Sequence, residues 1–267
     1  MKLGEGKPIT NQKGHCMYSL ILDTETTSLD KPFCYDVSWV IMDNSTGKLI
    51  DFSANVVEQV WHNLPLFESA YYKDKRQKYV EMMRKHDAVM DKWGYIMRKL
   101  AQDIRKYSIS AVYAYNSDFD DKVISYNCDW FKCNNPLDNI PVYDIWGYAS
   151  QYVTNQFQYK IFCEQFSRFT DTGNYKGSAE VVYQYLTSNP DFIEEHMGLF
   201  DSEIEAKILY LCIQNGAEWK NEYKVNKILT REKKKPFAIK INGKEIYSGE
   251  YIKKCVRNDT YSFTTGE

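Results

Sequence analysis

Two carboxylates close a short apolar run near the start of the chain, where Asp23 and Glu25 follow Tyr18–Leu22. Residues two apart on a β-strand project from the same face. Two such side chains beside an apolar strand would repel each other and lose hydration unless a cation joined them. A divalent ion bound by oxygen ligands would satisfy both carboxylates. The other interpretation of this pattern is a strand-to-turn junction with solvated acidic side chains.

A second acidic group follows the apolar run Ala111–Tyr115, in the sequence Asn116-Ser-Asp-Phe-Asp120. Ser117 and Asp120 have the spacing of a capping box, and acidic side chains are favourable in the first turn of a helix. The same junction between strand and helix would aim Asp120 across the sheet edge that carries Asp23. The two interpretations are compatible.

A histidine and an aspartate open a later apolar stretch, in the sequence His196-Met-Gly-Leu-Phe-Asp201. An imidazole has a pKa near neutrality and can accept a proton in catalysis. Asp201 would lie in the first turn of a helix, where an acidic side chain is also favourable for electrostatic reasons alone. A lone histidine is more often a surface or core residue than a catalytic one.

Taken in their order along the chain, these three motifs resemble the DEDD exonuclease superfamily, in its histidine-bearing branch. That branch includes proofreading subunits of bacterial polymerases, ribonuclease T and oligoribonuclease. The resemblance covers residues 18–216. Ser28 stands where the family usually has Gly, and Tyr115 where His is common, but every expected metal ligand is present. Asp144, at the end of a short apolar run, stands where the family often has a supporting aspartate.

The resemblance implies a two-metal 3′→5′ exonuclease that releases 5′-mononucleotides. Four carboxylates would hold two Mg²⁺ or Mn²⁺ ions and offset their charge: Asp23, Glu25, Asp120 and Asp201. His196 would take the proton from the attacking water. Activity would then depend on divalent cations.

A site for the terminal nucleotide is also implied, at Thr26, Leu29, Asn116 and Phe119, where Phe119 offers an aromatic face to a base. We expect single-stranded DNA or frayed 3′ ends as substrate, with a polymerase or replication protein as partner. A 3′→5′ exoribonuclease is the alternative, because contacts with the 2′-hydroxyl decide between the two. An inactive nucleic-acid-binding module or polymerase partner is the alternative from another class.

The elements that would position these residues alternate between strand and helix. Helical spacing of apolar residues marks 68–107, after three strands joined as a meander. Strands fit 18–22, 35–43, 48–57, 111–115 and 141–144, and helices fit 117–127, 156–168, 178–187 and 199–214. This order predicts an α/β, ribonuclease-H-like mixed sheet flanked by helices.

Charge is distributed unevenly over the 267 residues. The 34 basic and 36 acidic residues give a net charge of -2, but residues 220–257 contain 12 basic and four acidic side chains, a net charge of +8. Within them, Ala238–Tyr247 alternates around Asn242-Gly243, which predicts a β-hairpin with a type I′ turn. We expect a loosely ordered leader at 1–15, an exonuclease domain at 16–216 with a helical insertion at about 68–107, and a basic appendage at 217–267 that holds phosphates or a protein.

Composition is typical of a globular intracellular protein. The seven cysteines contain no Cys-x-x-Cys pair, and the N-terminal residues contain no apolar signal segment. We therefore expect reduced thiols in a cytoplasmic protein, with no membrane partner. Aromatic residues make up 15% of the chain, and we expect most of them in a tyrosine-rich core.

Overall fold

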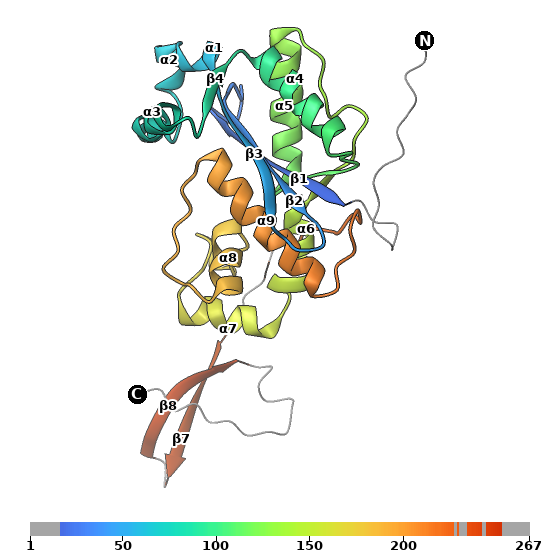
Figure 1. Cartoon of the computed structure of the whole chain (residues 1–267). Helices are drawn as coiled ribbons and strands as arrows, with labels where there is room; N and C mark the ends of the chain where they lie inside the picture. The colour runs from blue at the N-terminus through green and yellow to red at the C-terminus, as the bar shows by residue number, and fades with distance from the viewer. Residues whose placement is uncertain (1–16, 227–228, 230–233, 242–243, 253–267) are drawn as a thin grey trace.

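Three antiparallel strands form the centre of the fold. In the computed structural model, which describes residues 17–226, 229, 234–241 and 244–252, β1 (Tyr18–Thr26) pairs with β2 (Cys34–Asp43), and β2 pairs with β3 (Leu49–Val57). β1 continues four residues beyond the apolar run, so Asp23 and Glu25 belong to the strand itself. The expected meander is confirmed (Figure 1).

Parallel strands extend this meander on both sides. β5 (Val112–Ala114) pairs with β1, β6 (Val142–Asp144) pairs with β5, and β4 (Val89–Asp91) pairs with β3. The strand order is β4-β3-β2-β1-β5-β6. The sequence did not predict β4, which interrupts the expected helical stretch at 68–107 and forms the edge of the sheet.

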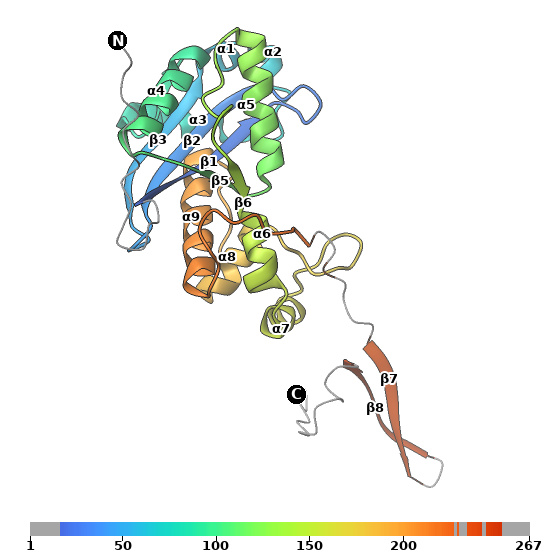
Figure 2. The same ribbon diagram turned by 90° about the vertical axis from the view of Figure 1, so that its right-hand side faces the viewer.

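Helices cover both faces of the sheet (Figures 1 and 2). α4 (Trp93–Lys106) and α5 (Ser117–Phe131) pack against one face through a cluster that includes Leu20, Leu22 and Trp39. α6 (Ile145–Ala149), α8 (Ala179–Thr187) and α9 (Gly198–Gln214) pack against the other face through a cluster that includes Ile21 and Val40. Because both faces are covered, consecutive residues of β1 are buried, which explains its continuous apolar run.

Shorter elements complete the chain. They are α1 (Glu58–Trp61), α2 (Leu64–Phe67), the 3₁₀ turn η1 (Lys73–Lys75), α3 (Arg76–Lys85), the π-helical turn η2 (Ser150–Thr154) and α7 (Phe157–Gln165). β7 (Lys234–Ile241) and β8 (Lys244–Ile252) pair as an antiparallel hairpin, as expected. The predicted turn at Asn242-Gly243 and the leader at 1–15 lie outside the described residues. No helix in the described part of the chain has the length and apolar character needed to cross a membrane.

Candidate active site

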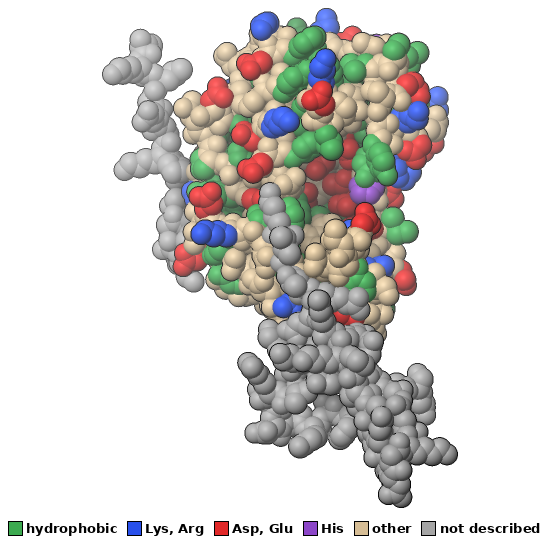
Figure 3. Space-filling view, turned by 180° about the vertical axis from the view of Figure 1, so that it is seen from behind, with side chains coloured by type: hydrophobic (Ala, Val, Ile, Leu, Met, Phe, Trp, Pro, Cys, Tyr) green, Lys and Arg blue, Asp and Glu red, His purple; other side chains and the backbone are tan. Residues whose placement is uncertain are grey.

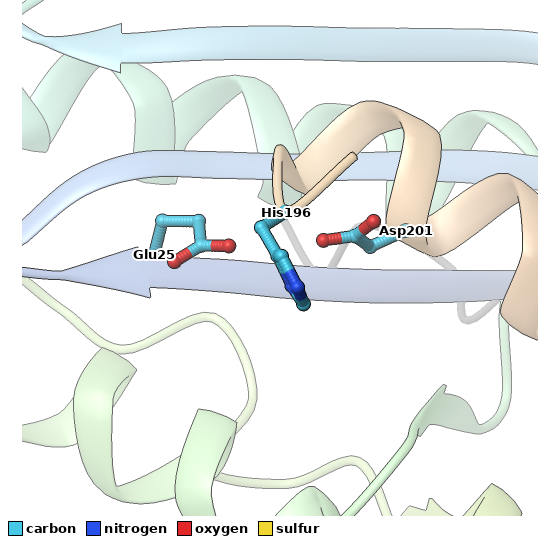
Figure 4. A group of neighbouring side chains, drawn as sticks. All are labelled: Glu25, His196 and Asp201. Carbon is cyan, nitrogen blue, oxygen red and sulfur yellow. The ribbon is translucent and has the colours of Figure 1, made fainter. Parts of the chain in front are cut away.

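β1 and α9 bring the first and third motifs together. Asp23 and Glu25 project from the face of β1 against which α9 packs, and Asp201 lies in the first turn of that helix. Ligand atoms of Glu25, His196 and Asp201 lie within 4.8 Å of one another. Figure 4 shows the two carboxylates directed toward each other from β1 and α9, with the imidazole beside them. Residues more than 170 positions apart thus form one polar group.

Asp120 reaches this group from α5 and is 3% exposed. Thr24 Oγ1 donates a hydrogen bond of 2.7 Å to its Oδ1, which ties α5 to β1. The predicted capping box does not form, because α5 begins after Asn116 in a left-handed conformation (φ 64°), without a side-chain cap. Asp120 is therefore turned toward β1, where Thr24 holds its carboxylate.

The carboxylates repel one another in a buried site. Burial, followed by the charges of Glu205, Asp120, Asp201 and Glu25, raises the pKa of Asp23 well above its usual value. Burial also raises the pKa of the other three carboxyls, to about 8 for Glu25, about 7 for Asp120 and about 9 for Asp201. Such shifts mean that the ionised cluster lacks compensating positive charge.

Two carboxylate oxygens in this cluster indicate what would supply that charge. Asp23 Oδ2 and Asp201 Oδ1 are buried and have no hydrogen-bond partner among the described residues. A buried oxygen acceptor without a donor is costly, whereas a divalent cation would satisfy it. The donor set, a group of carboxylates, suits Mg²⁺ or Mn²⁺. Figure 3 shows acidic side chains gathered in a hollow, with a histidine side chain beside them.

His196 occupies the irregular segment that leads into α9. Its backbone is left-handed (φ 51°), and its Nδ1 lies 3.8 Å from Glu194 Oε2. Burial lowers the pKa of the imidazole, and the positive charges of Lys75 and Lys176 lower it further. A lowered pKa keeps the ring neutral near pH 7, which is the form that can accept a proton.

Three acidic residues near this cluster were not singled out from the sequence. Asp36, on β2, accepts hydrogen bonds from Ser38 Oγ (2.6 Å), Tyr79 Oη (2.6 Å) and the backbone N–H of Gly198 (2.8 Å). The sequence contained a signal for two of them. Asp36 lies within a strongly apolar strand, and Glu205 lies one helical turn after Asp201.

Glu205 is 3% exposed and accepts a hydrogen bond of 3.2 Å from the backbone N–H of Tyr115. Burial, followed by the charges of Asp120 and Asp201, raises its pKa well above its usual value. Burial also raises the pKa of Glu194 to about 7. No pattern in the sequence distinguished Glu194 from exposed acids.

Asp144 supports the site from the neighbouring strand. Its Oδ1 accepts hydrogen bonds from the backbone N–H groups of Asn116 (2.9 Å) and Trp146 (2.8 Å). The first fixes the turn between β5 and α5, and the second caps α6. The structure therefore gives Asp144 a contact with the turn that precedes Asp120.

The residues expected to hold a nucleotide lie at or just after the ends of β1 and β5. Leu29 is 76% exposed in the loop after β1, and Asn116 is also exposed. Thr26 Oγ1 donates a hydrogen bond to the carbonyl of Ser28 (3.2 Å), within the same loop. Phe119 is half-buried against the core that includes α4 and α5. Leu29 and Asn116 are the more accessible of the four.

Comparison with known proteins identifies the fold. No protein-family model and no curated protein sequence matches the chain. A 3′-exonuclease characterised by its recognition of the 3′ end of a histone mRNA stem-loop is 11% identical with a TM-score of 0.50, and the match covers 89% of this chain and 92% of that chain. Exonuclease I from Methylocaldum szegediense is 14% identical with a TM-score of 0.50 over 75% of this chain. The match spans only 41% of that exonuclease. The expected ribonuclease-H-like α/β fold is confirmed.

Proposed function

We propose that this chain is a metal-dependent 3′→5′ exonuclease of the DEDD superfamily, in its histidine-bearing branch. The observation that carries the proposal is the meeting of Glu25, His196 and Asp201 within 4.8 Å, beside Asp23 and Asp120, in a fold shared with 3′-exonucleases. If these carboxylates were solvated surface groups, their oxygens would not be buried without a hydrogen-bond donor, as Asp23 Oδ2 and Asp201 Oδ1 are.

The four carboxylates would hold the divalent ions. Bound there, two Mg²⁺ or Mn²⁺ ions would supply a water nucleophile of lowered pKa and positive charge beside the leaving oxygen. Asp23 and Asp201 each present a buried oxygen that lacks a donor, Glu25 lies within 4.8 Å of Asp201 and His196, and Thr24 fixes the Asp120 carboxylate. Because these side chains are positioned by β1, α5 and α9, little reorganisation is needed on binding.

His196 would accept the proton of the attacking water. Its neutral imidazole is beside Glu25 and Asp201, so a water bound near those carboxylates is within reach of the ring. Glu194 Oε2 lies 3.8 Å from Nδ1, and the negative charges of Glu180 and Glu195 favour protonation of the ring. This arrangement, a base next to an orienting acid, is typical of general base catalysis.

The proposed substrate is the 3′ end of single-stranded or frayed DNA, held by Thr26, Leu29, Asn116 and Phe119. Trimming of frayed ends would place the enzyme beside a polymerase, the protein partner we propose. RNA is the second candidate, favoured by the likeness to an exonuclease that recognises an mRNA stem-loop. A protein that acts on RNA would contact the 2′-hydroxyl.

A matched pair of 5′-labelled DNA and RNA oligomers tests this proposal. With Mn²⁺ present, we expect a ladder of products shortened from the 3′ end, faster on DNA, and no products in chelator. Faster trimming of RNA would reverse the order of the two substrates. Intact oligomers under all conditions would favour an inactive nucleic-acid-binding module.

The basic segment at 217–267 is proposed to hold substrate phosphates. Its net charge of +8 over residues 220–257 would release counterions from a bound strand, so binding should weaken steeply with salt. Replacing Lys253 and Lys254 with Glu should raise the dissociation constant for a long oligomer and reduce this salt dependence. An unchanged salt dependence would indicate that the segment does not contact nucleic acid.

A further inference from the structure

The segment that carries His196 has few contacts of its own to fix the imidazole. Residues 189–197 form no helix or strand, and the ring accepts and donates no hydrogen bond among the described residues. A general base must nevertheless be held within hydrogen-bond distance of the proton that it accepts. Glu194 belongs to the same irregular segment, so a contact from another element is needed to hold the segment and the ring in place.

A second segment, Tyr72–Tyr79 (η1 and the first part of α3), contacts this region at its centre. The ring of Tyr72 stacks on the imidazole of His196, with centroids 4.3 Å apart and planes 11° from parallel. A parallel stack at this distance restricts rotation of the imidazole out of its plane. Tyr72 is half-buried, and its ring also makes an edge contact with Tyr71, with centroids 4.8 Å apart.

Two more contacts join the same segments on either side of the stack. Lys78 Nζ forms an ion pair with the carboxylate of Glu195. Tyr79 Oη donates a hydrogen bond to Asp36 Oδ2, which also accepts the backbone N–H of Gly198. A Cβ at Gly198 would lie 3.0 Å from Asp36 Oδ1, so any other residue there would crowd the Asp36 carboxylate. Positions 195, 196 and 198 are thus each connected to residues 72–79.

We propose that the segment Tyr72–Tyr79 orients the general base, with Tyr72 as the positioning residue that holds His196 against Glu25 and Asp201. This inference rests on the proposed function. Tyr72 acts through the imidazole, which covers one face of its ring. The segment belongs to the helical stretch between β3 and β4, which thereby contributes to the active site from outside the central sheet.

Single-turnover cleavage of a 5′-labelled DNA oligomer with Mn²⁺ tests this role. We expect Tyr72→Ala to lower the cleavage rate at saturating enzyme by about tenfold, with the dissociation constant of the oligomer unchanged, because a misplaced base loses rate and not affinity. Tyr72→Phe keeps the stack and should retain the rate. Tyr95→Ala, which removes an exposed tyrosine on α4, is the matched control.

The background in which Tyr72 is replaced distinguishes positioning from a general structural effect. In a His196→Ala protein, Tyr72→Ala should lower the cleavage rate by less than about twofold, because no imidazole remains to be oriented. An equal loss in both backgrounds would overturn the proposal. So would an increased dissociation constant with an unchanged rate, which would make Tyr72 a contact for the nucleotide.

The NMR signals of the imidazole supply a readout that does not require activity. The stacked ring of Tyr72 should shift the carbon-bound protons of His196 upfield, and the shift should be lost in Tyr72→Ala and kept in Tyr72→Phe. Comparison with His196→Ala assigns the signals among the four histidines of the chain. Unshifted signals in the wild-type protein would overturn the inference, whereas an inactive wild-type protein with shifted signals would contradict only the proposed function.

Discussion

Replacing Asp201 with Asn should stabilise the metal-free protein, although it removes a proposed metal ligand. Asp201 is 5% exposed, and burial, followed by the charges of Glu194 and Glu25, raises its pKa from 3.8 to about 9. The carboxyl is therefore protonated in the folded protein at pH values where it is ionised in the unfolded chain. Ionisation favours unfolding, so the stability that this group contributes is fully present below pH ~4 and is lost as the pH rises toward 9.

The size of the effect follows from the two pKa values of Asp201. One pKa unit corresponds to about 1.4 kcal/mol. Since Asn does not ionise, the free energy of unfolding of Asp201→Asn should exceed that of the wild type by about 3 kcal/mol at pH 6, and this difference should grow by about 1.4 kcal/mol per pH unit up to pH ~8.

Urea unfolding in chelator at pH 6, 7 and 8, followed by circular dichroism, measures this difference. Asp121→Asn, on the exposed side of α5, is the matched control and should change the free energy of unfolding by less than about 0.5 kcal/mol. Added Mn²⁺ should stabilise the wild type more than Asp201→Asn. A variant that is less stable than the wild type in chelator at all three pH values would show that the buried Asp201 carboxylate does not destabilise the folded protein.

Three further substitutions have expected outcomes. Asp23→Ala should abolish cleavage of a labelled oligomer while leaving its binding, measured by fluorescence anisotropy, largely unchanged; residual cleavage near the wild-type rate would contradict the metal role. His196→Ala should slow single-turnover cleavage by about 10²-fold or more, with partial recovery at higher pH as hydroxide replaces the base, and an unchanged rate would remove His196 from that role. Asp36→Ala leaves Tyr79 Oη and the Gly198 N–H without their acceptor, so urea unfolding should show a loss of about 2–4 kcal/mol, and a loss below about 0.5 kcal/mol would contradict the importance of these bonds.

The order of motifs along the chain was sufficient to predict the fold and to select residues that the structure brings together. Asp23 and Glu25 share a strand face, and Asp201 begins a helix, for reasons of local geometry that are visible in the sequence. The presence of β1 and α9 was likewise evident from apolar runs. These elements then place Glu25 and Asp201 side by side.

Long-range contacts account for what the sequence did not predict. Two of the three donors that make Asp36 compatible with a buried strand come from Tyr79 and Gly198, 43 and 162 positions away. The carboxylate of Asp120 is held by Thr24, 96 positions away, a contact that no local pattern predicts. The stack of Tyr72 on His196 likewise depends on two segments that meet only in the folded chain.

β4 was missed for a different reason. It has three residues, pairs with β3 alone, and is surrounded by helical sequence. A strand this short at the edge of a sheet has too few residues to establish an alternating pattern. Its pairing with β3 decides its conformation.

The direction and metal dependence of cleavage test the central claim most directly. A 5′-labelled single-stranded oligomer with a free 3′ hydroxyl should be shortened stepwise in Mn²⁺. The same oligomer with a blocked 3′ end should remain intact, and the Asp120→Asn variant should leave both oligomers intact. Equal cleavage of the free and blocked oligomers, or full activity in chelator, would contradict a metal-dependent 3′→5′ exonuclease.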